Sequence, residues 1–442
     1  MPGHFGRQGC AKPFEHVIVG VVRKRFELAP SSSAGHPCAE MTGDETATMR
    51  RQEAHDTAAD DAGGDPSDTR AITTEVVSTT EAFLALAPVW DEVVSDTAAP
   101  NVFLTWAWLS SWWECFETGT PWIVVVRERE TGRVVGLAPF FYQRVPRSGP
   151  VLSRQLAFMG CTVGSPDHLD VVARAGWEVI VAAAVARRVL ERRPRWDVLR
   201  LEGMAAQSLL VEQLLDRRRR WPVLVWETPC PWVALPPTWE EYVAGLKRKV
   251  RYNLRSRARR LERDSELPVR FETVAQPEEL PSALEALFAL HQGRREIDEP
   301  GAFGDASKVR FHRLVAERFL RAGGLRLSLL KVGDQTLAAA YCLRVGDVVS
   351  FYQTGFDPDW SKYGPGAAIV AHAIESAIRE GAREFDFLRG GEPYKLQWAT
   401  DSRDVLKVRI ARTALGRASV STYRIARDAR ERLKRNPPPQ SS

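Results

Sequence analysis

The stretch that decides the fold is Val348–Trp398, with the sequence VVSFYQTGFDPDWSKYGPGAAIVAHAIESAIREGAREFDFLRGGEPYKLQW. Its first residues, Val348 to Gly355, are rich in aromatic and β-branched side chains and predict a strand. Gly364-Pro365-Gly366 then opens a helix, because proline is tolerated at the first helical position, where its N–H would have no partner. Glu384 to Leu388 predicts the next strand. Together these segments form a β-α-β crossover, which is right-handed in almost all proteins.

A glycine-rich turn therefore lies at the end of one strand and at the mouth of a helix. Backbone N–H groups at a helix start favour an anion, and the helix dipole strengthens that preference. Glycines also let a bulky phosphate approach the main chain closely. The turn is consistent with a pyrophosphate cradle and equally with a helix that only has a tight first turn, because a lone glycine pattern is a weak signal.

The context of the turn favours the cradle. Ser361-x-x-Gly364-x-Gly366, between a strand and a helix, resembles the acyl-coenzyme A pyrophosphate loop of the GNAT acetyltransferases, whose usual form is Gln/Arg-x-x-Gly-x-Gly/Ala. YCLRVGDVVSFYQTGFDPDW and EFDFLRGGEPYKLQW resemble a GNAT-like branch associated with cellulose biosynthesis, which is distantly similar to the Fem-type aminoacyl transferases of cell-wall peptides. The likeness runs from about Asn101 to about Arg412. Ser361 replaces the usual Gln or Arg and Pro365 lacks an N–H, so we expect a cradle one donor short.

Length and composition predict a two-domain globular protein. The chain has 442 residues, of which 44% are hydrophobic and 26% charged, and a formal net charge of +5. Such a length exceeds one ordinary core. No apolar run is long enough to cross a bilayer, and the small charge does not by itself indicate a nucleic-acid partner. The six cysteines are scattered without a CxxC pattern, which predicts neither a disulfide framework nor a metal site, and the cytoplasm is the default location.

Four segments are expected along the chain. Residues 1–70 contain a long stretch of small and polar residues and predict a disordered arm. Residues 71–230 predict a degenerate GNAT-like domain without a phosphate loop, whose tryptophans are assigned to its core. Residues 231–412 predict the acyltransferase domain, and residues 413–442 a basic helix and tail. The expected fold class is α/β, with tandem GNAT-like domains whose mixed sheets are flanked by helices.

One histidine of the first domain is a possible base. His168 lies beside Asp167 and close to Asp170. Because no nucleophile is visible near it in the sequence, a polar strand edge is the favoured interpretation of this segment.

The second domain begins with an unusually basic segment, GLKRKVRYNLRSRARRLERD, from Gly245 to Asp264. A narrow apolar stripe predicts a helix that can dock while its other faces stay cationic. Three interpretations remain open: a solvated cationic helix, a helix that attracts the phosphates of coenzyme A or an anionic acceptor, and RNA contact, as a transferase using charged tRNA would need. Arg251 and Asn253 are the candidates for substrate binding.

The resemblance implies which residues hold the acyl donor. In GNAT folds the strand before the cradle separates from its neighbour and leaves main-chain groups free for the pantetheine arm; by resemblance this strand is Ser350 to Gly355. The implied donor-binding residues are Tyr352 and Gln353, near the thioester, and Ser361, Gly364, Gly366 and Ala367 in the cradle. Arg389 and Glu392 follow the next strand, at the end where open α/β sheets gather ligands, and are candidates for acceptor binding.

Acyl transfer also needs a proton acceptor and a partner for developing negative charge. Asp386 alternates with Phe385 and Phe387, so it is a candidate base if its strand face looks into the cleft; an arginine-paired structural aspartate is equally consistent. Tyr394-Lys395 matches an aromatic–lysine pair of Fem-type transferases. The resemblance implies Lys395 as an oxyanion partner and Tyr394 as the acid that protonates the thiolate; a clamp on the neighbouring Trp398 is the structural alternative.

The sequence thus predicts an acyltransferase that uses acetyl-CoA and acts on an amine or a sugar hydroxyl, linked to polysaccharide or cell-envelope metabolism. No metal is expected. Aminoacyl transfer from tRNA and a non-catalytic binding module for polysaccharide production are the alternatives. The acceptor and the oligomeric state are not determined by the sequence.

Overall fold

The computed structural model describes residues 71–116, 119–146, 152–161, 164–191, 195–217, 221–293 and 301–435. Residues 72–442 form one compact unit. The arm expected at residues 1–70 lies outside the described residues.

Helices and strands follow one another along the whole described chain. The first half contains, in order, β1 (Ile72–Val77), α2 (Thr80–Leu84), α3 (Ala87–Ser95), the 3-10 helix η1 (Val102–Leu104), α4 (Trp106–Phe116), β2 (Thr120–Glu128), β3 (Val134–Pro146), β4 (Leu152–Phe158), β5 (Val172–Ala173), α5 (Glu178–Leu190), β6 (Val198–Ala205), α6 (Leu209–Arg217) and β7 (Val223–Ala234). The second half contains α7 (Trp239–Gly245), α8 (Arg248–Asp264), β8 (Val269–Thr273), η2 (Pro277–Glu279), α9 (Leu280–Gly293), α10 (Ala306–Arg321), β9 (Leu325–Val332), β10 (Gln335–Val345), β11 (Val348–Phe356), η3 (Pro358–Tyr363), α11 (Pro365–Arg379), β12 (Glu384–Asp386), η4 (Lys395–Gln397), β13 (Asp401–Ala411) and α12 (Ala414–Arg435).

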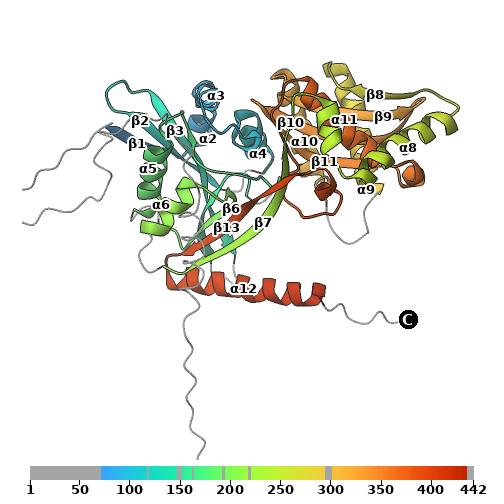
Figure 1. The fold of residues 1–442 in the computed structure, drawn as a ribbon. Coiled ribbons are helices and arrows are strands. Elements are labelled where there is room, and N and C mark those ends of the chain that lie inside the picture. Colours follow the sequence, from blue (N-terminus) through green and yellow to red (C-terminus); the bar gives the residue numbers. More distant parts are fainter. Residues whose placement is uncertain are drawn as a thin grey trace, which may run out of the picture. The chain divides into compact units, whose positions relative to one another are not determined.

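Both halves repeat one pattern of strands. In the first, β2, β3 and β4 are antiparallel neighbours, and β6 is parallel to β4 after the helix α5. In the second, β9, β10 and β11 are antiparallel neighbours, and β12 is parallel to β11 after α11. Figure 1 shows the resulting mixed sheet with helices on its faces. The predicted β-α-β crossover and the α/β fold class are confirmed.

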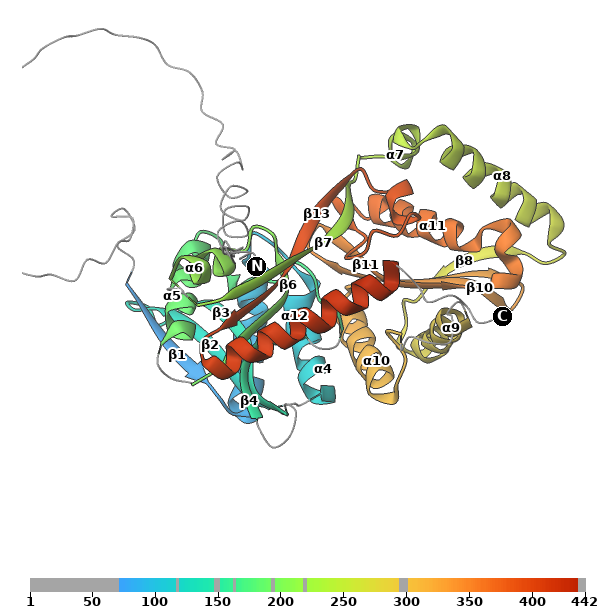
Figure 2. The same ribbon diagram turned by 90° about the horizontal axis from the view of Figure 1, so that it is seen from below.

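The two halves exchange their last strands. The sheet runs in the order β1-β2-β3-β4-β6-β13-β7-β12-β11-β10-β9-β8. Strand β13 of the second half therefore pairs with β6 of the first half. Strand β7 of the first half in turn pairs with β12 of the second half. Figures 1 and 2 show β7 and β13 as long neighbouring strands that run from one half to the other. One continuous sheet therefore joins the halves.

The boundary expected between residues 230 and 231 falls inside β7 rather than in a linker. Pro229 and Pro231 have no N–H to donate to a neighbouring strand, but their carbonyls still accept hydrogen bonds. Gly390 N–H donates to the Pro229 carbonyl (3.0 Å) and Phe387 N–H to the Pro231 carbonyl (2.9 Å). Both prolines thus belong to a strand whose partners come from far along the chain.

The central strand β10 is apolar on both faces. Ala339, Tyr341 and Leu343 belong to a core that includes α9, α10 and much of the first half, whereas Ala340 and Cys342 belong to a separate core under α11. Successive side chains of a strand point to opposite faces, so a strand covered by helices on both faces is apolar throughout.

The tryptophans of α4 lie in the core, as predicted. Trp108, Trp112 and Trp113 are buried. Trp108 also packs edge-on against Phe311 of α10, with ring centroids 5.0 Å apart. Large aromatic rings bury much apolar area, so this core holds the two halves together.

Candidate active site at the junction of the two halves

An opening in the sheet begins where β11 and β12 separate. The two strands pair at three positions, the last of which joins Ser350 to Asp386. Phe387 then donates its N–H to the Pro231 carbonyl of β7 (2.9 Å) instead of to β11. Among the described residues, no strand pairs with residues 351–355 on the β12 side of β11. Asp386 therefore lies at the point where the two strands separate, the apex of the opening.

The Asp386 carboxylate is buried and hydrogen-bonded at both oxygens. Oδ1 accepts the Leu388 N–H (2.7 Å), and Oδ2 accepts from Arg403 Nη2 (2.5 Å) and lies 3.0 Å from His168 Nε2. Burial raises the pKa of Asp386, but His168 and Arg403 outweigh that effect and hold the pKa below its ordinary value. Asp386 is thus a fixed negative charge, and its saturated oxygens favour an orienting role over direct contact with an acceptor.

A second buried carboxylate joins the halves beside the first. Asp167 accepts the Arg389 N–H at 2.8 Å and Arg389 Nε at 2.6 Å. Arg389 also donates to the Pro166 carbonyl. Burial raises the pKa of Asp167, against the opposing effects of Arg389 and His168. Arg389, expected to bind the acceptor, is therefore engaged by this carboxylate.

Strand β6 has a glycine where it contacts the loop from Pro166 to His168. Gly203 has φ +81°, and a Cβ there would lie 2.0 Å from the Pro166 carbonyl oxygen. Only glycine allows the loop from Pro166 to His168 to lie this close to β6.

Lys395 holds the loop that follows β12. Its side chain is 7% exposed, and its Nζ donates to the Arg389 carbonyl (2.7 Å) and lies 3.1 Å from Glu392 Oε2. Tyr394 packs against the core under α11. A lysine ammonium has three donors, so its two neighbours leave one donor for a further partner.

The turn before α11 is shaped by close packing. Gly364 is left-handed (φ +65°), and a Cβ there would lie 2.7 Å from Arg257 Nη1 of α8. A Cβ on Gly366 would lie 2.9 Å from the Phe356 ring. The Arg260 guanidinium also lies 5.7 Å from the Tyr363 ring at the end of η3. The basic helix α8 therefore lies against the predicted cradle.

The amides of this turn are largely used within the protein. Gly364 N–H donates to the Ser361 carbonyl and Ala367 N–H to the Gly364 carbonyl, both at 3.0 Å. Pro365 has no N–H. For Gly366 N–H, no hydrogen bond is recorded among the described residues. The turn thus offers one main-chain donor over residues 364–367, so an anion here would depend on side-chain charge.

The remaining expected residues lie in three different surroundings. Tyr352 points into the core shared by the halves, where its hydroxyl donates to the Gly164 carbonyl (2.9 Å) and burial raises its pKa. Gln353 follows it and is half-buried. On α8, Arg251 Nη1 donates to the Ala244 carbonyl at the end of α7 (2.5 Å), and Asn253 is half-buried. The structure therefore brings Tyr352 towards the junction but turns Arg251 to a neighbouring helix.

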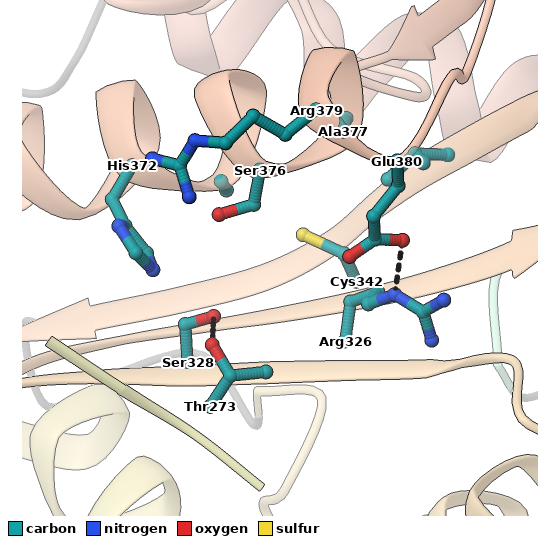
Figure 3. Close-up of a pocket in the computed structure, with 11 residues that line it drawn as sticks. Thr273, Arg326, Ser328, Cys342, His372, Ser376, Ala377, Arg379 and Glu380 are labelled. Atoms are coloured by element: carbon teal, nitrogen blue, oxygen red, sulfur yellow. Dashed lines mark hydrogen bonds and ion pairs between the residues drawn. The ribbon is translucent and has the colours of Figure 1, made fainter. Parts of the chain in front are cut away.

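A pocket of ≈ 260 Å³ lies beneath the C-terminal half of α11, away from the turn at the N-terminus of this helix. Figure 3 shows His372 and Ser376 on α11 facing Thr273 and Ser328, whose hydroxyls lie 2.9 Å apart. None of the residues expected to bind donor or acceptor lines this pocket, so it is separate from the candidate site.

Arg403 and Glu384 were not singled out by the sequence analysis. Arg403 lies on β13, donates to both Asp386 and Glu384, and has its Nε 3.3 Å from His168 Nε2. The sequence signal that could have pointed to them is the alternation of acidic and aromatic residues in EFDF. A charge on a buried strand needs a partner, so these acids imply a nearby cation.

No cluster of three or more His, Cys, Asp or Glu side chains in the described part of the chain could hold a metal ion. In the same part, no helix is long and apolar enough to span a membrane.

Comparison with known proteins follows from this geometry. Residues 248–396 match the acetyltransferase (GNAT) domain, a stretch that extends from α8 through the turn before α11 to Lys395. Over this stretch the second half of the chain is similar to the GNAT acetyltransferase domain. No curated protein matches the sequence.

Among solved structures, FemX aligns with a TM-score of 0.51 at 10% identity, over 73% of this chain and 95% of its own. A conserved protein of unknown function from Bacteroides thetaiotaomicron aligns with a TM-score of 0.50 at 14% identity, over 77% and 100%. A tandem GNAT protein from the clavulanic acid biosynthesis pathway aligns with a TM-score of 0.39 at 14% identity, over 77% and 100%. The first two likenesses extend over both halves and concern the fold. The branch associated with cellulose biosynthesis stays a prediction.

Proposed function

We propose that this protein transfers an acyl group, acetyl in the first instance, from coenzyme A to an amine or a sugar hydroxyl. The opening between β11 and β12 carries this proposal. An extended thioester arm would pair with the β12 side of residues 351–355 as an added strand does. Its carbonyl would then lie towards the apex, where Asp386, His168 and Lys395 gather from three parts of the chain.

The nucleotide end of the donor would lie at the turn formed by Ser361, Gly364, Gly366 and Ala367. Because this turn offers few free amides, cationic side chains supply most of the attraction for the phosphates. Arg257 and Arg260 of α8 lie against the turn. This proximity supports the interpretation of the basic helix as a phosphate-attracting element.

Two residues are proposed to act on charge that develops at the thioester. Lys395 would stabilise the oxyanion with its remaining donor. The phenol of Tyr394 would lie close to the departing thiolate. Glu392, which pairs with Lys395, would help to position that ammonium. The proposed cytoplasmic location rests on the scattered cysteines, and the link to polysaccharide or cell-envelope metabolism rests on the sequence resemblance.

An Arg257→Glu variant is expected to bind acetyl-CoA about tenfold or more weakly than wild type, which corresponds to roughly 1.4 kcal/mol. Charge reversal beside Gly364 replaces attraction for the pyrophosphate with repulsion. Isothermal titration calorimetry at low salt measures the change.

Arg259→Glu is the matched control for this experiment. It alters the same net charge on the same helix, but residues two apart lie on nearly opposite faces of a helix. Its acetyl-CoA affinity should stay within about threefold of wild type, apart from long-range effects that salt screens. Equal losses in both variants would remove Arg257 from the binding site, and an absence of heat with wild type would remove the donor assignment.

Aminoacyl transfer from tRNA is the second candidate, favoured by the largely exposed cationic surface of α8. Phosphate contacts release counterions, so tRNA affinity would fall steeply as salt rises. Filter binding of aminoacylated tRNA over a salt series, together with its protection from hydrolysis, tests this candidate. An acetyl-CoA thioester that binds but stays intact with every acceptor would instead favour a non-catalytic module.

A further inference from the structure

We propose that His168, from the first half of the chain, is the general base of the acyl transfer and that Asp386, from the second half, is the residue that positions it. This inference rests on the proposed function and assigns a residue of that site. It gives the half without a phosphate loop a direct part in the chemistry, so neither half would be active alone.

The contact between the two side chains has the geometry of an oriented base. His168 Nε2 lies 3.0 Å from Asp386 Oδ2, and the imidazole is 16% exposed whereas the carboxylate is 2% exposed. A carboxylate on one ring nitrogen fixes the proton there and leaves the lone pair on the other. Among the described residues, no partner is recorded for His168 Nδ1. The inner nitrogen is thus held by a buried charge, and the outer one is the free acceptor.

Arg403 completes this arrangement from the other side. Its Nε lies 3.3 Å from His168 Nε2, a contact in which Nε2 would have to accept; the shorter contact of Nε2 with the Asp386 carboxylate, at 3.0 Å, instead requires Nε2 to carry the proton. Arg403 is instead bound through its Nη atoms to Asp386 and Glu384. The charged groups around the imidazole are therefore Asp386 and Glu384 from β12, Arg403 from β13, and Asp167 with its partner Arg389.

The backbone around His168 is held in an unusual conformation. Ser165, His168 and Leu388 are the non-glycine residues with positive φ in the described chain, at 42°, 55° and 58°. All three lie in the two segments that meet at Asp386 and Asp167. Asn101 Nδ2 donates to the Asp167 carbonyl (2.9 Å) and the His168 carbonyl (2.7 Å), which holds the loop in place. Backbone strain of this kind collects at functional sites, where surrounding contacts maintain it.

The position fits the reaction. Asp386 lies at the apex of the opening between β11 and β12, where the thioester carbonyl would come, and His168 extends the site from there into the first half. In the step itself, His168 Nδ1 takes a proton from the acceptor's N–H or O–H as that nitrogen or oxygen bonds to the acyl carbon. The carbon–sulfur bond then breaks, the electron pair leaves on the thiolate, and the imidazolium returns its proton to the sulfur, which regenerates His168 and releases coenzyme A.

The test follows thiol release from acetyl-CoA with a panel of amines and sugars, for the full chain and its variants over a pH series. His168→Gln should lower kcat by about 10²–10⁴-fold with the acceptor KM within about threefold, and should abolish the fall in kcat/KM on the acid side.

Asp386→Asn should lower kcat with little change in KM, and the double variant should be no slower than His168→Gln, because the two residues act as one unit. Added imidazole should partly restore a His168→Ala variant.

His372→Gln is the matched control, since His372 lies on α11 and stacks on Phe271 at 4.3 Å, outside the site. It should retain wild-type kcat and pH dependence. A second measurement needs no turnover: diethyl pyrocarbonate should acylate His168, as mapped by peptide mass, and saturating acetyl-CoA should protect it.

The outcomes separate the two levels of the proposal. If wild type turns over and His168→Gln keeps its rate and its acid limb, the base assignment falls while the proposed function stands. The same holds if acetyl-CoA binds but leaves His168 as reactive as before. If wild type neither binds acetyl-CoA nor releases thiol, the proposed function falls and the base assignment falls with it.

Discussion

An Arg389→Met variant is expected to lose about 3–5 kcal/mol of unfolding free energy at neutral pH, the range found when one partner of a buried ion pair is removed. Arg389 is bound to Asp167 through its main-chain N–H and through Nε, and Asp167 is completely buried. Methionine replaces the volume of the side chain but leaves the carboxylate without its cation. Because burial already raises the pKa of Asp167, part of the loss should be recovered at lower pH, where the carboxyl takes up a proton. Urea denaturation at pH 7 and pH 5 measures both effects.

A double-mutant cycle and a surface control make this test specific. Adding Asp167→Asn to Arg389→Met should restore much of the lost stability, since it removes the unpaired charge. The control Arg383→Met lies six residues earlier and breaks the ion pair between Arg383 and Asp347. The Arg383 side chain is 85% exposed. Exposed pairs contribute at most about 1 kcal/mol, so this variant should stay close to wild type. A loss below about 1 kcal/mol for Arg389→Met would show that this pair does not hold the halves together.

Stability is expected to fall on acidification because of one buried histidine. His312 is completely buried on α10, packed against Phe311 and Phe303, and burial lowers its pKa from 6.5 to about 3. Between these values the unfolded chain takes up a proton that the native protein does not, so each unit of falling pH removes about 1.4 kcal/mol. From pH 6.5 to pH 5, His312 alone should therefore destabilise the protein by about 2 kcal/mol. The contribution is fully present above pH 6.5 and is lost as pH falls.

A His312→Phe variant should lose this part of the pH dependence. Unfolding free energies of wild type and variant, measured between pH 7 and pH 5, should differ in slope even if they differ at pH 7 as well. His372→Gln is the comparison, because His372 is only half-buried and should carry a smaller share of the slope. Parallel curves for His312→Phe and wild type would mean that His312 takes up a proton as readily in the native state as in the unfolded chain, so that its pKa is not lowered by burial.

The sequence predicted those elements whose signals are local. The strand and helix on either side of Gly364 follow from β-branched residues, from proline at the first helical position and from 3.6-residue spacing, all of which act within a few turns of chain. The cationic surface of α8 was also visible, although not its place against Gly364.

The pairing of distant segments was not predicted, because nothing local specifies it. A domain boundary was expected after residue 230, yet the carbonyls of Pro229 and Pro231 accept bonds from Gly390 and Phe387, respectively, in the other half. Asp386 and His168 were each considered as a base, but their contact was not predicted and Arg403 was not singled out, since His168 and Arg403 are 235 residues apart and meet only in the fold.

The sequence by itself determined the α/β class, the crossover at Val348–Trp398 and the residue types that resemble an acyl-coenzyme A site. The tertiary structure decided which strands neighbour one another, which of the expected residues are engaged by buried partners, and that His168 of one half lies on Asp386 of the other. The physical reason is that propensity, turn chemistry and hydrophobic periodicity act over a few residues. The strand exchange and the buried charges are instead selected by the free energy of the whole sheet, in which each buried polar group must find its partner.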